Sequence, residues 1–125
     1  MLKYLETKST TLSENTLFNK FKDKKVLVMG SGNSINEVNW EALDYDCIAT
    51  TTHFYLNDKI RKSKNITHVT LSEIIDFTHP NLIEFLENNP ECTLALEPVW
   101  GRPFYNSDVW KNFESKYRDR LIYYN

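Results

Sequence analysis

Short runs of apolar and β-branched residues recur along this chain and alternate with segments whose apolar residues follow a helical spacing. Within each run the apolar character is nearly continuous, which is typical of strands that are buried on both faces in a parallel sheet. Polar and turn-forming residues bound the runs. The pattern therefore predicts five strands, at 25–29, 47–52, 67–71, 93–97 and 121–124.

Helices are predicted in three of the intervening segments, at 54–62, from residue 80 onward and at 106–120. Pro80 stands where the second helix would begin, with Thr78 as a possible N-cap, and Ser107 is the expected cap of the third. Apolar residues at helical spacing would form the buried stripes. In chain order the stripes are Tyr55, Leu56 and Ile60; Leu82, Ile83, Phe85 and Leu86; and Val109, Trp110, Phe113 and Tyr117.

Alternating strands and helices indicate the α/β class, and the expected fold is a Rossmann-like doubly wound parallel sheet of about five strands with helices on both faces. Residues 1–23 form a polar lead-in with a short helix expected at 16–21, and residues 24–125 form the domain. A chain of 125 residues is long enough for one hydrophobic core. We therefore expect a single domain.

Composition and charge restrict the possible partners. Hydrophobic residues make up 41% of the chain and charged residues 26%, which is a globular composition. The formal net charge of −2 argues against a nucleic-acid partner and against a role at a membrane surface. No stretch approaches the roughly 20 apolar residues of a transmembrane segment, and the first residues lack the apolar part of a secretory signal.

The cysteines and histidines do not indicate a metal site. Cys47 and Cys92 fall in predicted strands without metal-ligand spacing, so we expect free, buried thiols in a protein of the reducing cytoplasm. His53, His68 and His79 share no metal-ligand spacing either.

The sequence Gly30-Ser31-Gly32-Asn33-Ser34 directly follows the first predicted strand. In an open parallel sheet, ligands bind at the carboxyl ends of the strands where the strand order reverses, and the loop after the first strand usually lies there. The first glycine would permit a backbone angle that other residues resist, and the second would let a phosphate approach the N–H groups of a helix start. Asn33 and Ser34 fit that helix start, and Ser34 could cap the helix or bond an anion. The turn predicts a nucleotide or another anionic ligand, with a turn that binds nothing as the alternative.

Three familiar nucleotide motifs fit poorly. The dinucleotide fingerprint requires a third small residue where Ile35 stands, and an acid near the end of the second strand, where the sequence is Thr52-His53. The first acid after this strand is Asp58. A methyltransferase cofactor would usually also require an acid at the end of the second strand. A P-loop is excluded because no Gly-Lys-Ser/Thr follows the glycines.

Two segments, "KKVLVMGSGNSINEVNW" and "YDCIATTTHFYLNDK", resemble the start of the bacterial lipooligosaccharide sialyltransferases, glycosyltransferase family 42. Members of that family have a strand that enters a Gly-Asn-Gly-Pro-Ser-Leu turn, followed by an acidic-aliphatic pair and an aromatic residue. Here the turn is followed by Glu37-Val38 and Trp40. The family's second strand ends in Asn, then Gln-Phe-Tyr and an acidic pair before Lys, where this chain has residues 52–59. The resemblance covers residues 24–60, and beyond residue 65 only the order of elements is similar.

The resemblance implies that the chain binds CMP or a CMP-sugar such as CMP-sialic acid as a substrate, with no resident cofactor. In the family the glycine turn and the end of the second strand hold the cytidine nucleotide. The implied nucleotide contacts are Gly30, Ser31, Gly32, Asn33, Ser34 and Thr52. The family has asparagine where this chain has Ser31 and Thr52, and a hydroxyl reaches less far than an amide.

Family enzymes are considerably longer than this chain, and their catalytic histidine and the tyrosines near the leaving phosphate lie in the later half. Three expectations follow. The chain could be part of a larger enzyme, a nucleotide-binding remnant, or a small domain that uses the turn differently.

Among the histidines, His53 follows the second predicted strand and is the candidate general base, with a loop histidine that has no such role as the alternative. His68 is expected to be a strand histidine satisfied by hydrogen bonds, and His79, before Pro80, is expected to cap a helix.

The segment "VWGRPFYNSDVW" follows the fourth predicted strand and would overhang the same edge of the sheet. Arg102 could bind a phosphate or carboxylate, and Tyr105 lies beside it on this expected substrate loop. The alternative is an aromatic loop that packs on the sheet. Trp40 and Trp110 are expected to be packing residues.

The sequence thus predicts a sialyltransferase-like nucleotide-binding domain, a glycosyltransferase if it is active. A non-catalytic Rossmann-like interaction domain and an unrelated nucleotide- or pyrophosphate-handling transferase stay open as alternatives.

Overall fold

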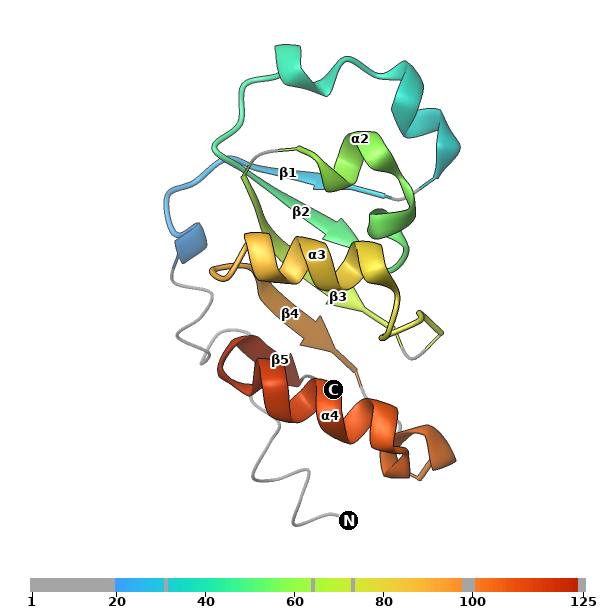
Figure 1. The fold of residues 1–125 in the computed structure, drawn as a ribbon. Coiled ribbons are helices and arrows are strands. Elements are labelled where there is room, and N and C mark those ends of the chain that lie inside the picture. The colour runs from blue at the N-terminus through green and yellow to red at the C-terminus, as the bar shows by residue number, and fades with distance from the viewer. Residues whose placement is uncertain (1–19, 31, 64, 73, 98–100, 124–125) are drawn as a thin grey trace.

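The structure, a computed structural model, describes residues 20–30, 32–63, 65–72, 74–97 and 101–123. Its centre is a sheet of five parallel strands (Figure 1). The strands are β1 (Val26–Met29), β2 (Cys47–Thr51), β3 (Ile66–Leu71), β4 (Thr93–Leu96) and β5 (Leu121–Tyr123). Their ends lie within one residue of the predicted positions, so the predicted α/β class with five strands is confirmed. The helix expected at 16–21 falls largely outside the described residues.

Helical segments connect each strand to the next. The 3₁₀ helices η2 (Asn33–Glu37) and η3 (Trp40–Ala42) lead to β2; η4 (Phe54–Leu56) and α2 (Asp58–Arg61) lead to β3; α3 (Pro80–Asn88) leads to β4; and η5 (Pro103–Asn106), α4 (Asp108–Tyr117) and η6 (Arg118–Arg120) lead to β5. The described α-helices α2, α3 and α4 lie on the same side of the sheet (Figure 1).

The spatial order of the strands, β1-β2-β3-β4-β5, is the order of the chain. Crossovers between parallel strands are right-handed, so connections that always add the next strand at the same edge pass over the same face. In this respect the arrangement differs from a doubly wound sheet, in which the order reverses and helices cover both faces. These five strands therefore contain no point at which the strand order reverses and a ligand could bind. A ligand site would lie along the edge formed by the carboxyl ends of the strands.

The hydrophobic core fills the space between the sheet and the helices. Its buried side chains include Ile48, Val69, Leu94 and Leu96 from the strands, Leu82, Phe85 and Leu86 from α3, and Trp110 and Phe113 from α4. Two members of the predicted stripes do not belong to it. Leu56 is 57% exposed and Val109 is 43% exposed.

Side-chain caps fix where the helices begin. Ser107 Oγ accepts the N–H of Trp110 at 3.3 Å, as predicted. The second helix begins at Pro80, as predicted, but its cap is His79 and not Thr78. The segment at 54–62 is divided into η4 and α2 because Asn57 has an extended backbone and its Oδ1 caps α2.

The residues expected to serve packing are buried. Trp40 and Trp110 are each 1% exposed. Cys47 and Cys92 are free and buried, and burial raises the pKa of the Cys92 thiol to about 12. Because the thiolate is the reactive form of cysteine, this burial disfavours reaction of Cys92 at neutral pH.

His68 lies inside β3 and is 8% exposed. Its Nδ1 is 2.8 Å from Oγ1 of Thr93, its neighbour on β4, which confirms the expected strand histidine satisfied by hydrogen bonding. The ring of Phe21 approaches it edge-on at 5.8 Å between centroids. Burial, and secondarily the nearby positive charge of Lys20, lower the pKa of His68 to about 4.

This histidine should make the protein sensitive to mild acid. Its pKa is lower in the folded state than its ordinary value of 6.5, so the unfolded chain binds a proton more readily. The stabilisation that neutral His68 contributes is fully present above pH 6.5. It is lost as the pH falls from 6.5 to about 4, which lowers the free energy of unfolding by at most about 3 kcal/mol. We expect the melting temperature to fall through this window in the wild type and to fall less in His68→Gln, as followed by circular dichroism at half-unit pH steps. Equal pH dependence in the two proteins would contradict the assignment.

Candidate functional site

A surface hollow of about 620 Å³ lies at the carboxyl ends of β1 and β2. Its walls come from the segment after β1 and the segment after β2, which are the two segments predicted to bind a nucleotide. The lining residues are Asn33, Asn36, His53, Leu56, Asn57, Asp58 and Lys59. The hollow is lined mainly by hydrogen-bonding side chains.

The glycine turn lies beside this hollow, but its geometry differs from the prediction. Neither Gly30 nor Gly32 has a positive φ, and Gly32 has an extended backbone with φ −70° and ψ 155°. The prediction that the first glycine adopts a backbone angle that other residues resist is therefore wrong, because the φ angles of both glycines are accessible to other residues. The space around them is open instead. A Cβ at Gly30 would meet no atom within 4 Å, and one at Gly32 would meet only Ser34 Oγ, at 4.0 Å.

The helix expected after the turn is the 3₁₀ helix η2, only five residues long. Gly32 is its N-cap and makes no side-chain cap, so the predicted capping role of Ser34 is wrong; Ser34 lies inside η2 and is exposed. A single short 3₁₀ turn lacks the aligned N–H groups of a long α-helix, which weakens the expected helix-terminal phosphate site. Ser31 lies outside the described residues.

Two hydrogen bonds join the walls of the hollow. Asn57 Nδ2 donates to Asn36 Oδ1 at 3.0 Å. Lys59 Nζ donates to the carbonyl of Val38 at 3.1 Å and lies 4.3 Å from the centre of the Trp40 ring. The segment after β1 is thereby attached to the start of α2, although the two are separated by the whole of β2.

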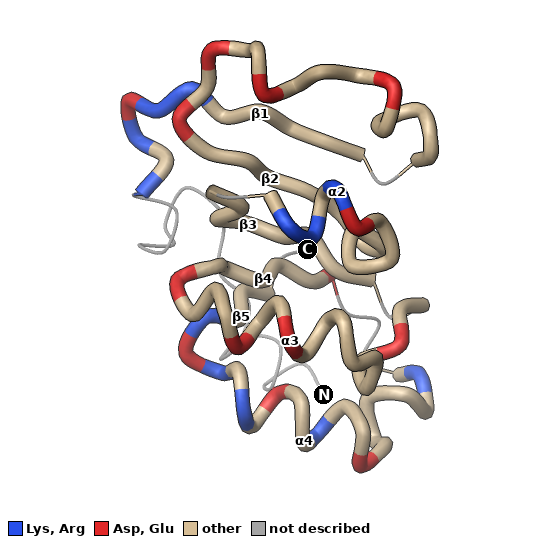
Figure 2. Tube along the Cα trace, turned by 45° about the horizontal axis from the view of Figure 1, so that its top comes forward, with Lys and Arg blue, Asp and Glu red and all other residues tan. Residues whose placement is uncertain are grey.

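The charged residues of the hollow already have partners. Asp58 pairs with Arg61 at 2.7 Å, and Lys59 is used as described above. Figure 2 shows acidic and basic residues interspersed along the described chain. An anion in the hollow would therefore meet amide, imidazole and backbone donors, and its recognition would depend on hydrogen bonds.

Thr52, a predicted nucleotide contact, follows the end of β2 with φ 31°. Positive φ is unfavourable for a β-branched residue, because Cβ approaches the backbone carbonyl. Hydrogen bonds to both neighbouring strands, β3 and β1, fix the end of β2 around Thr52. The N–H of Thr52 donates to the carbonyl of Thr70 at 2.8 Å, and Thr50 Oγ1 donates to the carbonyl of Met29 at 3.0 Å. Local strain thus occurs at the end of the strand where the ligand was predicted.

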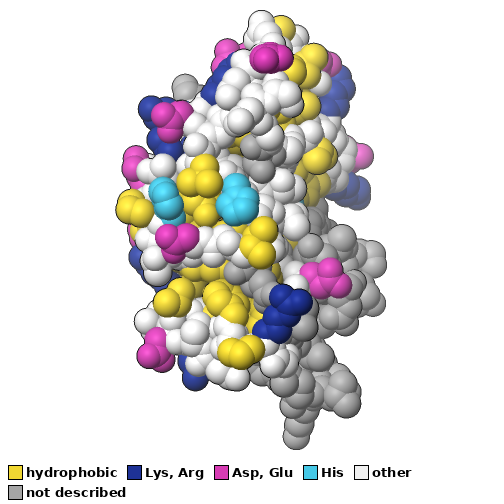
Figure 3. All heavy atoms as spheres, turned by 90° about the vertical axis from the view of Figure 1, so that its right-hand side faces the viewer, with side chains coloured by type: hydrophobic (Ala, Val, Ile, Leu, Met, Phe, Trp, Pro, Cys, Tyr) yellow, Lys and Arg dark blue, Asp and Glu magenta, His cyan; other side chains and the backbone are white. Residues whose placement is uncertain are grey.

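His53 lies where it was predicted, at the end of β2, and lines the hollow. Its ring is 6.3 Å from that of Tyr55, and the Tyr55 ring is 5.1 Å from that of His79, at the start of α3. Histidine side chains accordingly appear together with hydrophobic ones on this edge of the molecule (Figure 3). Sequence reasoning assigned His79 to capping alone, because nothing in the order of residues shows that the ends of β2 and β3 bring these rings together.

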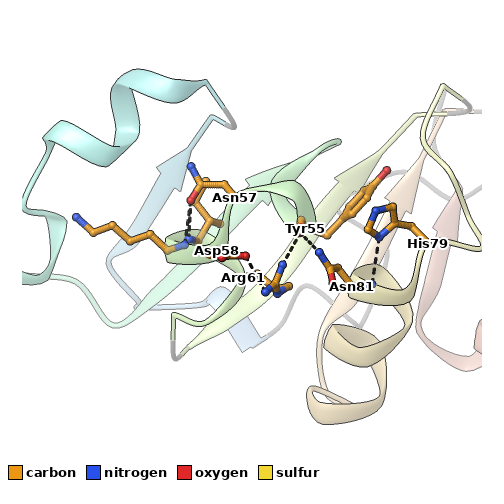
Figure 4. Close-up of polar contacts among 8 residues, drawn as sticks. Tyr55, Asn57, Asp58, Arg61, His79 and Asn81 are labelled. Carbon is orange, nitrogen blue, oxygen red and sulfur yellow. Dashed lines mark hydrogen bonds and ion pairs between the residues drawn. The ribbon is translucent and has the colours of Figure 1, made fainter.

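A polar network supports this cluster (Figure 4). The carbonyl of Tyr55 accepts from Arg61 at 3.0 Å and from Asn81 Nδ2 at 3.4 Å, and the Tyr55 hydroxyl accepts the N–H of Asp76 at 3.3 Å. The Tyr55 side chain is 2% exposed. Tyr55 therefore joins η4, α2, α3 and the segment after β3 into one unit.

The predicted substrate loop is placed differently. Tyr105 is 7% exposed and packs in the aromatic core, with its ring 5.3 Å from that of Trp110, so its assignment to an open loop is corrected. Arg102 is exposed and is the N-cap residue of η5. Neither residue lines the hollow. The aromatic residues of this segment pack on one another, because burying their large apolar area is more favourable than exposing it.

Within the described ranges, no group of three potential metal-ligating side chains is present, and no helix is long and apolar enough to cross a membrane. Comparisons of the chain with protein-family models, with curated proteins and with solved structures find no match. The site has to be interpreted from its own residues.

The strain at Thr52 gives a stability prediction. Asparagine tolerates positive φ far better than threonine, so Thr52→Asn should raise the free energy of unfolding by about 1 kcal/mol. The melting temperature should then rise by a few degrees. Thr51→Asn is the matched control, because Thr51 lies inside β2 opposite Thr70, and asparagine disfavours strands. If both variants melt lower than the wild type, strain at Thr52 does not limit stability.

Proposed function

We propose that this domain binds CMP or a CMP-sugar at the carboxyl ends of β1 and β2, for glycosyl transfer of the sialyltransferase kind. One observation carries the proposal. The two segments that resemble those enzymes are separate in the sequence, yet together they line the hollow of about 620 Å³. Parallel pairing of β1 and β2 brings the ends of both segments to this edge, and their polar side chains form most of the lining there.

The chemistry of the lining suits a nucleotide. The amide of Asn33 and the Nδ2 of Asn36 offer hydrogen-bonding groups that can read the edge of a base, and Asn57 holds Asn36 in place through its own Nδ2. A Cβ at Gly30 would meet no atom within 4 Å and one at Gly32 would meet only Ser34 Oγ, so the space is open enough for a phosphate to approach the main-chain N–H groups there. In this arrangement the nucleoside occupies the hollow, and the phosphate lies at the glycine turn.

His53 is the candidate base for transfer. In the proposed step, an acceptor hydroxyl oxygen attacks the anomeric carbon of the sugar, and the bond from that carbon to the phosphate oxygen of CMP breaks. The bonding electron pair leaves with CMP. The hydroxyl proton passes to a ring nitrogen of His53, which has no hydrogen-bond partner among the described residues.

Two other functions predict different ligands. An interaction domain with no ligand predicts that the glycine turn tolerates bulk without consequence. A nucleotide-handling enzyme of another type predicts a preference for purine nucleotides over CMP.

Nucleotide binding can be tested by a thermal-shift series with CMP, CDP, UMP, AMP, NAD and S-adenosylmethionine. A ligand at a hundred times its dissociation constant should add about 2.7 kcal/mol of stability, so CMP should raise the melting temperature by several degrees. Gly32→Val should abolish the shift yet leave the unliganded melting temperature nearly unchanged, because Gly32 is extended and its surroundings are open. Gly101→Val is the control, since a Cβ there also meets no atom within 4 Å; it should keep the CMP shift.

The results separate the three functions. A shift with AMP or NAD in place of CMP favours the unrelated transferase. No shift with any of the six compounds contradicts nucleotide binding and favours the interaction domain. A CMP shift that persists in Gly32→Val would place the nucleotide elsewhere.

The role of His53 can be tested separately by release of CMP from CMP-sialic acid in the presence of an acceptor hydroxyl. His53→Gln should retain the CMP thermal shift and slow release by about a hundredfold, the usual contribution of a general base. Equal rates would remove His53 from the reaction. If the wild type binds CMP and releases none, the function is limited to nucleotide binding.

A further inference from the structure

The edge of the sheet formed by β1 is exposed. The strand order places β1 and β5 at the two edges of the sheet (Figure 1). In β1, Val26 is 37% exposed and Val28 is 73% exposed. All four β1 residues are apolar, and the strand contains none of the lysines, prolines or bulges by which proteins usually protect an edge strand from pairing. β1 can therefore accept a further strand.

The hydrogen bonds around β1 show which of its backbone groups face outward. The carbonyl of Lys25 accepts a backbone N–H from the residue just before β2 at 2.8 Å. The carbonyl of Met29 accepts Thr50 Oγ1, on β2, at 3.0 Å. Because the hydrogen-bonding groups of successive strand residues alternate between the two sides, those of Val26 and Val28 face away from the sheet. No other segment of the described chain hydrogen-bonds to them.

A second copy of the chain fits this edge. If two β1 strands run antiparallel about a two-fold axis at Leu27, Val26 of each copy lies opposite Val28 of the other. The outward groups then face each other, so each pair can exchange both of its backbone hydrogen bonds. The paired valines also cover one another, since opposite residues project on the same face. A shift of the pairing by one residue would place outward groups opposite inward ones and lose these bonds.

The charges beside β1 favour antiparallel over parallel pairing. Lys24 and Lys25 directly precede the strand. Antiparallel pairing about Leu27 places the lysines of the two copies at opposite ends of the interface, with Lys24 of one copy opposite Gly30 of the other. A parallel arrangement would bring the lysines of both copies together, which is unfavourable.

The other edge of the sheet does not offer the same surface. In β5, Ile122 and Tyr123 are buried and Leu121 is half-buried. Pairing through β1 uses the same strand of each copy, so the interface is isologous and closes at two copies. The expected assembly is therefore a dimer.

We propose that the protein forms a two-fold dimer through antiparallel pairing of β1, which joins the two five-stranded sheets into one continuous sheet. This inference does not depend on the proposed function. A contact limited to two strands of four residues is smaller than the roughly 1,200 Å² of a stable interface. The dimer is therefore reversible, with a dissociation constant in the micromolar range.

Sedimentation velocity over a micromolar concentration series tests for the dimer. The wild type should change from monomer to dimer as its concentration rises. Val28→Lys should raise the dissociation constant of the dimer by at least about tenfold, because it alters both symmetry-related valine pairs. Ile74→Lys is the matched control, since Ile74 is 70% exposed but lies after β3, outside the sheet. It should dimerise as the wild type does.

Two results of this experiment would overturn the proposal. One is a wild type that stays monomeric at the highest concentration. The other is a dimer whose dissociation constant is unchanged in Val28→Lys, because the interface would then lie elsewhere. Both lysine variants replace exposed side chains, so both should keep the circular dichroism spectrum of the wild type.

Cysteine cross-linking tests the register. Opposite residues have Cα atoms about 5.5 Å apart, which suits a disulfide. A mixture of Val26→Cys and Val28→Cys should therefore form a disulfide-linked dimer under mild oxidation. Each variant alone should not, because identical positions lie two residues apart along the interface, beyond the roughly 7 Å limit. Both variants carry Cys47→Ala, since Cys47 is the neighbour of Val26 on β2. Cross-linking of Val28→Cys alone, or none in the mixture, would contradict pairing about Leu27.

Discussion

Parallel pairing of the five strands is the constraint on which the rest of this structure depends. All five strands run in the same direction, so their carboxyl ends meet at one edge of the sheet, and every segment that leaves a strand begins there. The turn after β1, the strained Thr52 after β2 and the segment that precedes His79 are neighbours for this reason alone. The backbone hydrogen bonds between the strands thereby determine which side chains lie close enough to form one site.

Much of the fold could be predicted from the sequence, because burial on both faces leaves a direct mark on composition. Strands such as β4, in which all four residues are buried, can be recognised as continuous apolar runs. Ser107 and Pro80 marked helix starts correctly, since capping depends on residues close together in the chain. The order of the strands leaves no comparable mark, and the sequential order was not predicted.

The candidate site was predicted in part. The turn after β1 and His53 were placed at the hollow because they follow strands directly. The joining of Asn36 to Asn57, and of Tyr55 to Asn81, depends on how neighbouring connections pack, which no local pattern encodes. Tyr105 shows the opposite error. A residue near Arg102 on an aromatic segment suggested a ligand contact, whereas the packing of Tyr105 against Trp110 placed it in the core.

The sequential order of the strands also bears on how the chain folds. Each strand pairs only with the strands just before and just after it in the chain, so every pairing closes a loop of a single connection. The entropy lost on closing a loop grows with its length, and folding slows as contacts become more distant in sequence. A doubly wound sheet must bring its middle strand back past earlier ones before the second half can pair. Here the sheet can grow one strand at a time, so that each completed pair provides the edge on which the next strand forms.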